Sequence, residues 1–151
     1  MPTVADVLSK KAERGGAGIV TVTPDDRVLD AVKVMNDHRI GSVIVVDKAD
    51  GKMVGIFTER DLLTRVVAEG LKPESTKVAD VMTRRVVCCS RQTSADELRS
   101  VIREKRVRHI PVVDDDTPVG MVSIGDLNNA RTEDLEQTVQ YLELYLRSSG
   151  G

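Results

Sequence analysis

Residues 54–61 read VGIFTERD, and residues 119–126 read VGMVSIGD, so one short segment occurs twice in this chain. The likeness extends beyond these segments, because residues 22–62 resemble residues 89–127 along their whole length. The second copy is two residues shorter, and the difference falls in an Asp-rich stretch with Gly or Pro that is typical of a turn. A change of length confined to a turn is what two copies of one fold would show, so the sequence predicts an internal repeat.

The first copy has a clear predicted order of elements. A helix is indicated by an apolar stripe, with Asp25 or Asp26 as its N-terminal cap; the stripe consists of Val28, Ala31, Val32 and Met35. Two short apolar runs, residues 42–46 and 53–57, predict strands joined as a hairpin. Thr58 then begins a second helix, whose predicted buried stripe is Leu62, Leu63, Val66 and Val67.

The second copy repeats this order. Its first helix has a stripe made of Leu98, Val101, Ile102 and Lys105. Strands are predicted over residues 110–113 and 119–122, and Ser123 stands where Thr58 stood in the first copy. We therefore expect a second helix to begin at Ser123.

Alternating strands and helices predict an α/β or α+β fold, built as a tandem pair of β-α-β-β-α repeats with pseudo-twofold symmetry. Each repeat is too small to be stable alone, so we expect the two to bury their sheets on each other. The predicted parts are a first repeat with an N-terminal lead-in helix (residues 1–70), a linker (71–77), a second repeat (78–130), and a C-terminal helix with a frayed tail (131–151).

The C-terminal helix is predicted to begin at Thr132, because two acidic residues follow and favour the positive end of the helix dipole. Its apolar residues recur at near-heptad spacing, at Leu135, Val139, Leu142 and Leu146. Two arrangements stay open: the helix packs back on its own module, or it packs on a second subunit.

Composition narrows the classes of function. Hydrophobic residues make up 40% of the 151 residues and charged residues 30%, which is typical of a folded globular chain. A net charge of −2 and an aromatic content of 2% argue against nucleic-acid binding, because neither phosphate attraction nor base stacking is available. No apolar run approaches the roughly 20 residues of a membrane span, and no signal peptide is evident, so we expect a cytoplasmic protein without membrane contact.

Cys88 and Cys89 are adjacent, so on a strand they would point to opposite faces and could not form an unstrained disulfide. We expect one thiol in the core and the other facing outward. The chain has only two histidines and no CxxC pattern, so no metal site is predicted.

The repeated segments resemble the CBS-domain family, and the tandem arrangement resembles the pair called a Bateman module. The resemblance is carried by residues 54–61 and 119–126, by RHIPVVD at residues 108–114, and more loosely by IGSVIVVD at residues 40–47. It covers residues 4–127, and the layout looks like that of a stand-alone bacterial CBS-pair protein. The resemblance implies a cleft on each side of the sheet interface, adenosyl ligands such as AMP, ADP, ATP, NAD or S-adenosylmethionine in the clefts, and dimerisation into a flat disc.

The chemistry of the repeated segment suits such a ligand. Thr58 or Ser123 places a hydroxyl and free backbone N–H groups at a helix start, where phosphate or ribose oxygens could bind. One turn later, the carboxylate of Asp61 or Asp126 could accept both hydrogens of a ribose diol. The alternative is that each Thr/Ser and Asp form only a helix capping box, and a cap and a site could coexist.

By family alignment, each cleft would combine residues of both copies. The Asp126 cleft would include Ser123 with Ile40, Gly41 and Ser42, and the Asp61 cleft would include Thr58 and Arg60 with Val107, Arg108 and His109. Arg60 stands where the second copy has Gly125, which predicts a more cationic Asp61 cleft suited to additional phosphates. Ile44 replaces the Pro of the second copy and makes the first site less typical, so which cleft is occupied stays open.

The function predicted from these residues is regulatory. An adenine nucleotide would bind between the repeats and switch the conformation or partner binding of a homodimer in signal transduction, with a protein target that the sequence does not name. No nucleophile–base pair, P-loop or GxGxxG pattern is present, so the sequence does not predict an enzyme. The alternative is a ligand-free module for dimerisation or partner binding.

Overall fold

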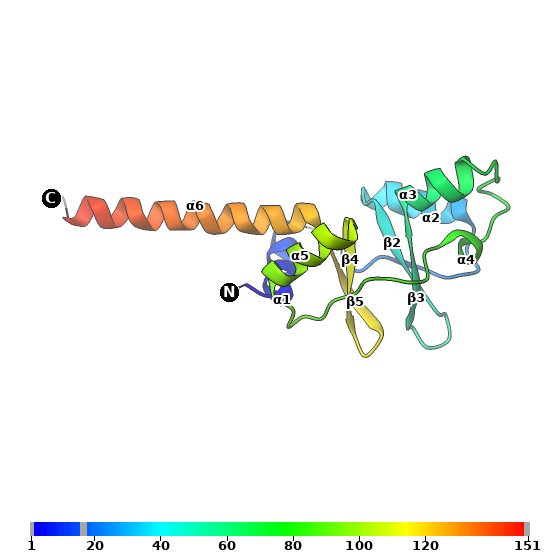
Figure 1. The fold of residues 1–151 in the computed structure, drawn as a ribbon, viewed down its shortest axis with the longest axis horizontal. Coiled ribbons are helices and arrows are strands. Elements are labelled where there is room, and N and C mark those ends of the chain that lie inside the picture. The colour runs from blue at the N-terminus through cyan, green and yellow to red at the C-terminus, as the bar shows by residue number, and fades with distance from the viewer. Residues whose placement is uncertain (1, 16–17, 150–151) are drawn as a thin grey trace.

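The computed structural model describes residues 2–15 and 18–149. Its first copy contains α1 (Val4–Glu13), β1 (Thr21–Val22), α2 (Val28–His38), β2 (Ser42–Val46), β3 (Met53–Thr58), α3 (Glu59–Asp61) and the π-helical segment η1 (Leu62–Val67). The second copy contains α4 (Val78–Val81), α5 (Ala95–Lys105), β4 (His109–Asp114), β5 (Thr117–Ser123) and α6 (Ile124–Ser149). Figure 1 shows the two hairpins next to each other, with α6 projecting away from them.

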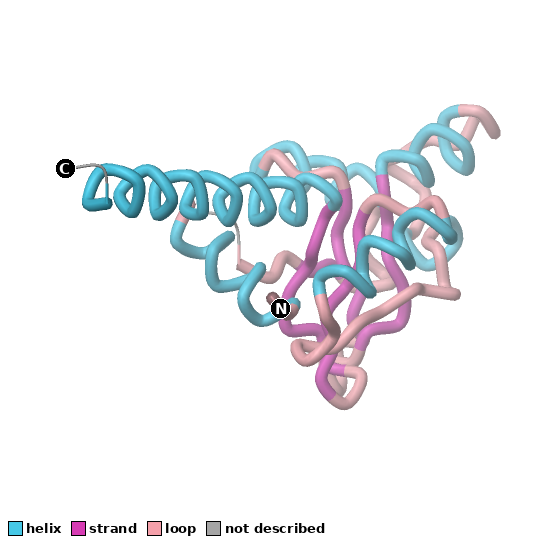
Figure 2. Tube along the Cα trace, turned by 60° about the vertical axis from the view of Figure 1, so that its left-hand side comes forward, coloured by secondary structure: helices cyan, strands magenta, loops and turns pink. Residues whose placement is uncertain are grey.

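The strands form two small sheets of matching design. In the first, β1 runs parallel to β2 and β2 antiparallel to β3; in the second, β4 runs antiparallel to β5. The register shifts between Val45 and Val46 in one hairpin and between Val112 and Val113 in the other, which are equivalent positions of the repeat. The predicted hairpins are therefore confirmed, and the copies match even in their β-bulges. Figure 2 shows the strands at the centre of the molecule with helices around them.

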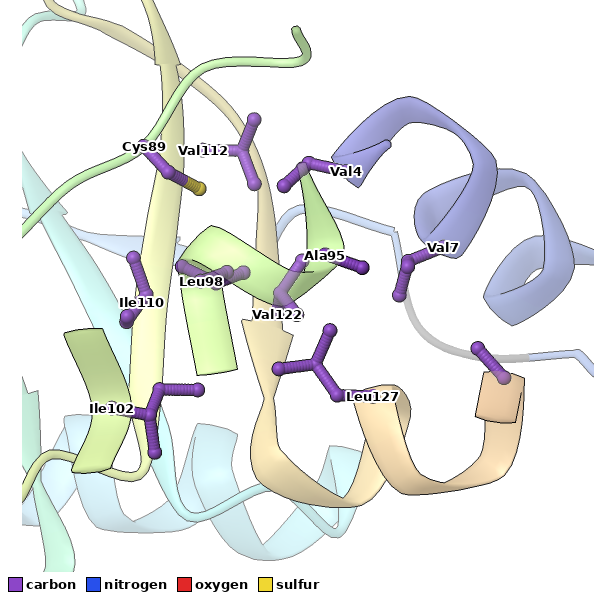
Figure 3. Packing of buried hydrophobic residues seen from close by; sticks show 11 residues of the cluster. Val4, Val7, Cys89, Ala95, Leu98, Ile102, Ile110, Val112, Val122 and Leu127 are labelled. Carbon is purple, nitrogen blue, oxygen red and sulfur yellow. The ribbon is translucent and has the colours of Figure 1, made fainter. Parts of the chain in front are cut away.

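Each copy is completed by the lead-in helix of the other. Val4 and Val7 of α1 are buried in the core of the second copy, which also contains Cys89, Ala95, Leu98, Ile102, Ile110, Val112, Val122, Leu127 and Ala130. Figure 3 shows these side chains converging from α1, α5, β4, β5 and the start of α6. In the same way, Val78 and Val81 of α4 are buried in the core of the first copy.

Backbone hydrogen bonds fix this exchange. The N–H of Val4 donates to the carbonyl of Thr93 over 2.8 Å, and the N–H of Val78 donates to the carbonyl of Asp26 over 2.9 Å. The sequence grouped α1 with the first repeat, whereas its apolar face is buried on the second. The two copies are thus held together by the exchange of their lead-in helices.

Two local predictions about the helices are wrong. The N-cap of α2 is Arg27, with Asp30 bonded back to its N–H, while the carboxylate of Asp26 accepts instead from the N–H of Thr23. In the helix after Thr58, Leu63 is 62% and Val67 59% exposed, although both were assigned to the buried stripe. The core face of this helix carries Leu62 and Val66. Leu63 and Val67 each follow one of these residues directly, and a step of one residue turns a helical side chain by roughly a quarter turn, here toward solvent.

The C-terminal helix is longer than predicted. α6 begins at Ile124, directly after Ser123, and continues through Thr132 without a break, because no proline or glycine interrupts residues 126–149. Leu127 and Ala130 are buried in the core, whereas every described side chain from Leu135 to Arg147 is exposed. Of the two arrangements left open, packing back on its own module is not observed for these residues. The predicted frayed tail includes residues 150–151, which lie outside the described residues.

The cysteine prediction is confirmed, since Cys88 is exposed and Cys89 is buried. Burial raises the pKa of the Cys89 thiol to about 11, with a smaller contribution from Cys88.

Within residues 2–15 and 18–149, no helix combines the length and apolar character needed to cross a bilayer.

Candidate functional site

The repeated segment forms the same capping box in both copies. The N–H of Asp61 donates to Oγ1 of Thr58 over 3.1 Å, and the N–H of Thr58 donates to Oδ2 of Asp61 over 3.0 Å. The matching distances for Ser123 and Asp126 are 3.1 and 2.9 Å. The capping interpretation therefore holds for both aspartates, and their further contacts decide whether either is also available to a ligand.

Asp61 is held by its own chain. Its carboxylate is buried, and Oδ1 accepts a hydrogen bond of 3.0 Å from the hydroxyl of Thr83. The same oxygen lies 3.7 Å from Nε of Arg65, and Nη1 of Arg65 donates to the carbonyl of Met82 over 2.9 Å. Both oxygens of Asp61 are therefore engaged within the protein, and little of the side chain faces solvent.

Asp126 lies in a pocket of about 560 Å³ that is lined by both copies. Its Oδ2 accepts from the N–H of Ser123 and from Nζ of Lys11, which lies 3.0 Å away. Lys11 also donates to the carbonyl of Met121 over 2.9 Å, so its position is fixed by two contacts. Within the described residues, Oδ1 of Asp126 accepts no hydrogen bond. This carboxylate therefore keeps one oxygen for a ligand in the pocket.

The pocket brings together about half of the predicted site residues. It contains Ile40, Gly41, Ser42, His109, Ser123 and Asp126. The other predicted residues do not line it: Thr58, Arg60, Asp61, Val107 and Arg108. The first group corresponds to the cleft that family alignment assigned to Asp126, with the addition of His109, which the alignment placed with Asp61.

Gly41 explains how His109 reaches this pocket. A Cβ at Gly41 would lie 3.3 Å from Cε1 of His109 and 3.3 Å from Cδ of Glu59, which is tighter than an ordinary contact. Glycine thus leaves room for the imidazole and the carboxylate at the junction between the copies. His109 pairs with Ser123 across the β4–β5 hairpin, so the same hairpin carries both residues to the pocket.

The pocket wall also contains residues that the sequence did not assign to a site. Basic side chains come from Lys11 on α1, and from His38 and Arg39 at the end of α2; apolar surface comes from Leu8, Ile19, Val20, Ile44, Val119 and Met121. Arg39 carried a weak signal, as the basic residue just before Ile40 and Gly41. Lys11 carried none, because its place depends on the packing of α1 against the other copy.

Charge in the pocket is mainly positive. Lys11 and Arg39 line it beside the carboxylate of Asp126, even though the whole chain has a net charge of −2. Burial lowers the pKa of His109 below its usual value; Glu59 opposes this shift, and Lys11 adds to it. The sequence predicted the stronger positive charge at Asp61, but Arg60 is exposed outside the pocket. The structure places a cationic pocket at Asp126.

Comparison with known proteins agrees with the repeat and the fold. The family model described as CBS domain matches residues 4–68 and again residues 78–133. The chain belongs to the CBS-domain family. Its two matches make it a CBS pair, and they confirm the family resemblance and the fold class predicted from the sequence.

Relatives of this CBS pair include both curated sequences and solved structures. The chain is 34% identical to the CBS domain-containing protein CBSX3, mitochondrial, of Arabidopsis thaliana, over 96% of this chain and 72% of that protein. A CBS-domain protein from Agrobacterium tumefaciens is 39% identical, with a TM-score of 0.75, and the match covers 85% of this chain and 98% of that one. For a CBS-domain protein from Burkholderia ambifaria MC40-6 the identity is 39%, the TM-score 0.79, and the coverage 87% and 95%.

The two copies of this CBS pair therefore have similar backbones, but their aspartates have different surroundings. Both keep the signature hydroxyl and aspartate, but the carboxylate of Asp61 accepts a hydrogen bond from Thr83 and forms an ion pair with Arg65. The carboxylate of Asp126 faces a pocket that is walled by aliphatic side chains and bordered by Lys11 and Arg39.

Proposed function

We propose that this CBS pair is a regulatory module that binds one adenine nucleotide (AMP, ADP, ATP or NAD) in the Asp126 pocket. The observation that carries the proposal is the combination, in one pocket, of a half-engaged carboxylate, aliphatic walls and the cations Lys11 and Arg39. Asp61 offers no equivalent, because its oxygens are already bonded to Thr58 and Thr83. We therefore propose one nucleotide per chain.

Each part of the nucleotide has a counterpart in the pocket. Oδ1 of Asp126 suits the ribose hydroxyls, since an ionised carboxylate only accepts hydrogen bonds and a diol offers two donors. Ile19, Ile40 and Met121 suit the faces of adenine, because burying flat apolar surface between aliphatic side chains is favourable without aromatic stacking.

The phosphate groups would be recognised by the cations at the rim. Lys11 and Arg39 carry full positive charges, and a phosphate would hydrogen-bond to either one. Lys11 is bonded to Asp126 in this structure, so a bound nucleotide would share or take over that ammonium group. In the proposed exchange, the ammonium group of Lys11 gives up one charged hydrogen bond and gains another, so no buried charge is left without a partner.

Two proteins of this fold are described with ligands of the proposed class. One is a CBS domain pair in complex with 5′-methylthioadenosine and S-adenosyl-L-methionine, and the other is CBSX2 in complex with AMP. At 24% and 21% identity they share the fold alone with this chain. They support the choice of ligand class, while the choice of site rests on the pocket itself.

The proposed regulatory mechanism is a shift between arrangements of the two copies. A nucleotide in this pocket would touch residues 40–42 of the first copy and Ser123 of the second, so it would favour the arrangement that it contacts best. The pocket lies at the start of α6, which offers a path to the rest of that helix. We propose that the chain acts in this way in the cytoplasm and is not itself an enzyme.

One relative of this chain is an enzyme, but the match covers only a small part of that enzyme. The chain is 35% identical to the inosine-5′-monophosphate dehydrogenase of Methanocaldococcus jannaschii over 75% of its own length, but over only 22% of the enzyme. This short coverage supports a regulatory role for the chain and no transfer of the dehydrogenase activity.

Isothermal titration calorimetry with AMP, ADP, ATP and NAD tests the proposal. We expect saturable binding of at least one of them with one site per chain. Asp126→Asn keeps an oxygen to accept from Ser123 but removes the charge, so affinity should fall roughly 10- to 100-fold, as expected for a lost charged hydrogen bond of about 1.5–3 kcal/mol.

Asp61→Asn is the matched control for this experiment. It makes the same chemical change at the equivalent position, so it should leave nucleotide affinity unchanged even if it lowers the melting temperature. Equal losses in both variants, or no binding of any of the four compounds by the wild type, would contradict the proposal. The second result would favour a ligand-free module for dimerisation or partner binding.

A further inference from the structure

The outer half of α6 carries an apolar stripe that its own chain does not cover. The stripe consists of Leu135 (58% exposed), Val139 (54%), Leu142 (51%) and Leu146 (66%). Figures 1 and 2 both show this part of α6 extending beyond the rest of the molecule. The stripe therefore lies where a second molecule can reach it along its whole length.

We propose that α6 forms a parallel two-stranded coiled coil with α6 of a second copy of this chain. The stripe residues are separated by four, three and four positions, which is the alternation of a coiled-coil seam with a mean period of 3.5. Val139 and Leu146 then occupy a positions, and Leu135 and Leu142 occupy d positions. Val139 at a, between Leu135 and Leu142 at d, is the combination that favours two strands over three or four.

Charge next to the seam selects the parallel orientation. Glu136 and Glu143 occupy the e positions, while the g positions hold the uncharged Thr138 and Tyr145. In an antiparallel pair, e positions face e positions, so glutamate would meet glutamate on one flank of the seam. In a parallel pair, e faces g, so Glu143 meets Thr138 of the second copy and no like charges are opposed. The same helix surface is thus complementary to itself in one orientation only.

Parallel association has a consequence for the assembly. An in-register pair places the same residue of both copies at the twofold axis, which is an isologous contact that closes after two chains. The seam spans about two heptads, which is short for a coiled coil, so we expect a dimer whose population depends on protein concentration.

Sedimentation equilibrium over about a hundredfold range of concentration tests the proposal. The wild type should populate a dimer. Leu142→Asp places a carboxylate in the seam and should raise the dimer dissociation constant about tenfold or more. Leu144→Asp is the matched control, because Leu144 is 64% exposed on the opposite face of α6, at an f position. Both side chains are exposed in the single chain, so circular dichroism should show both variants folded.

Disulfide formation tests the orientation in a Cys88→Ser background, in which Cys89 stays buried. Leu142→Cys should oxidise to a covalent dimer, because a parallel pair brings the two copies of position 142 together. Leu144→Cys should not. A wild type that is monomeric throughout, or a dimer indifferent to Leu142→Asp, would overturn the proposal. A dimer that depends on Leu142 but fails to cross-link at position 142 would overturn the parallel orientation.

Discussion

Arg39 and Arg106 occupy equivalent positions of the two repeats, and replacing each by glycine should separate backbone strain from ligand binding. Each arginine ends a helix in the left-handed conformation, with φ of 53° and 55° respectively. Glycine adopts this conformation readily, whereas a residue with a Cβ does not. Arg39 lines the Asp126 pocket and Arg106 does not. The two substitutions therefore have the same backbone effect and a different effect on the site.

The magnitudes follow from these two contributions. Relief of the left-handed conformation should stabilise the fold by about 1–2 kcal/mol, against a cost of about 0.5–1 kcal/mol for the extra freedom of glycine in the unfolded chain. Each variant should thus gain about 0.5–1 kcal/mol in free energy of unfolding and melt roughly 1–4 °C higher. Because Arg39 is exposed, its contact with a phosphate should contribute only about 1 kcal/mol, so Arg39→Gly should weaken nucleotide binding about fivefold.

The assay combines a thermal melt with calorimetric titration for both variants. We expect both to melt higher than the wild type and only Arg39→Gly to bind the nucleotide more weakly. A loss of affinity together with a gain of stability cannot result from partial unfolding. If Arg39→Gly binds as tightly as the wild type, or if Arg106→Gly loses as much affinity, the assignment of Arg39 to the site is wrong.

Two further predictions concern stability. Gly55→Ala should lower the free energy of unfolding by about 1–3 kcal/mol, because the added Cβ would lie 2.8 Å from the backbone oxygen of Thr83. Gly120→Ala should lower it less, since its Cβ meets the flexible end of the Leu8 side chain at 3.0 Å. Equal shifts of the urea midpoint in the two variants would refute this difference. The fold lowers the pKa of His109 and so favours its neutral form, while the unfolded chain takes up a proton near pH 6.5. The wild type should therefore lose more stability than His109→Gln as the pH falls from about 7.5 to about 5.5, and parallel pH profiles of the two proteins would show that His109 makes no such contribution.

Much of the fold could be predicted because its signals are local. Short apolar runs separated by turn residues gave the two hairpins within a residue or two of their observed ends, and helical spacing gave α2 and α5. The errors arose where a local pattern did not determine what packs against a helix or where it begins. Leu63 and Val67 lie next to the buried Val66 but face solvent, and the continuous α6 ran through the predicted start at Thr132.

About half of the proposed site could be predicted, and the reason lies in where its residues come from. Gly41, Ser123 and Asp126 belong to the repeat, so the likeness of the two copies pointed to them. Lys11 does not, and it reaches Asp126 across 115 positions of the chain. No pattern within one element carries information about such a contact.

The sequence by itself determined that the chain is a duplicated unit with two equivalent hydroxyl–aspartate caps. Only the tertiary structure decided that the carboxylates of the two caps have different partners and different access to a pocket. Thr83 and Arg65 fold over Asp61, whereas the exchanged helix α1 places Lys11 beside Asp126 and leaves a pocket there. The physical reason is that a cap is formed by residues three positions apart, while the surroundings of a carboxylate depend on which distant segments pack against it.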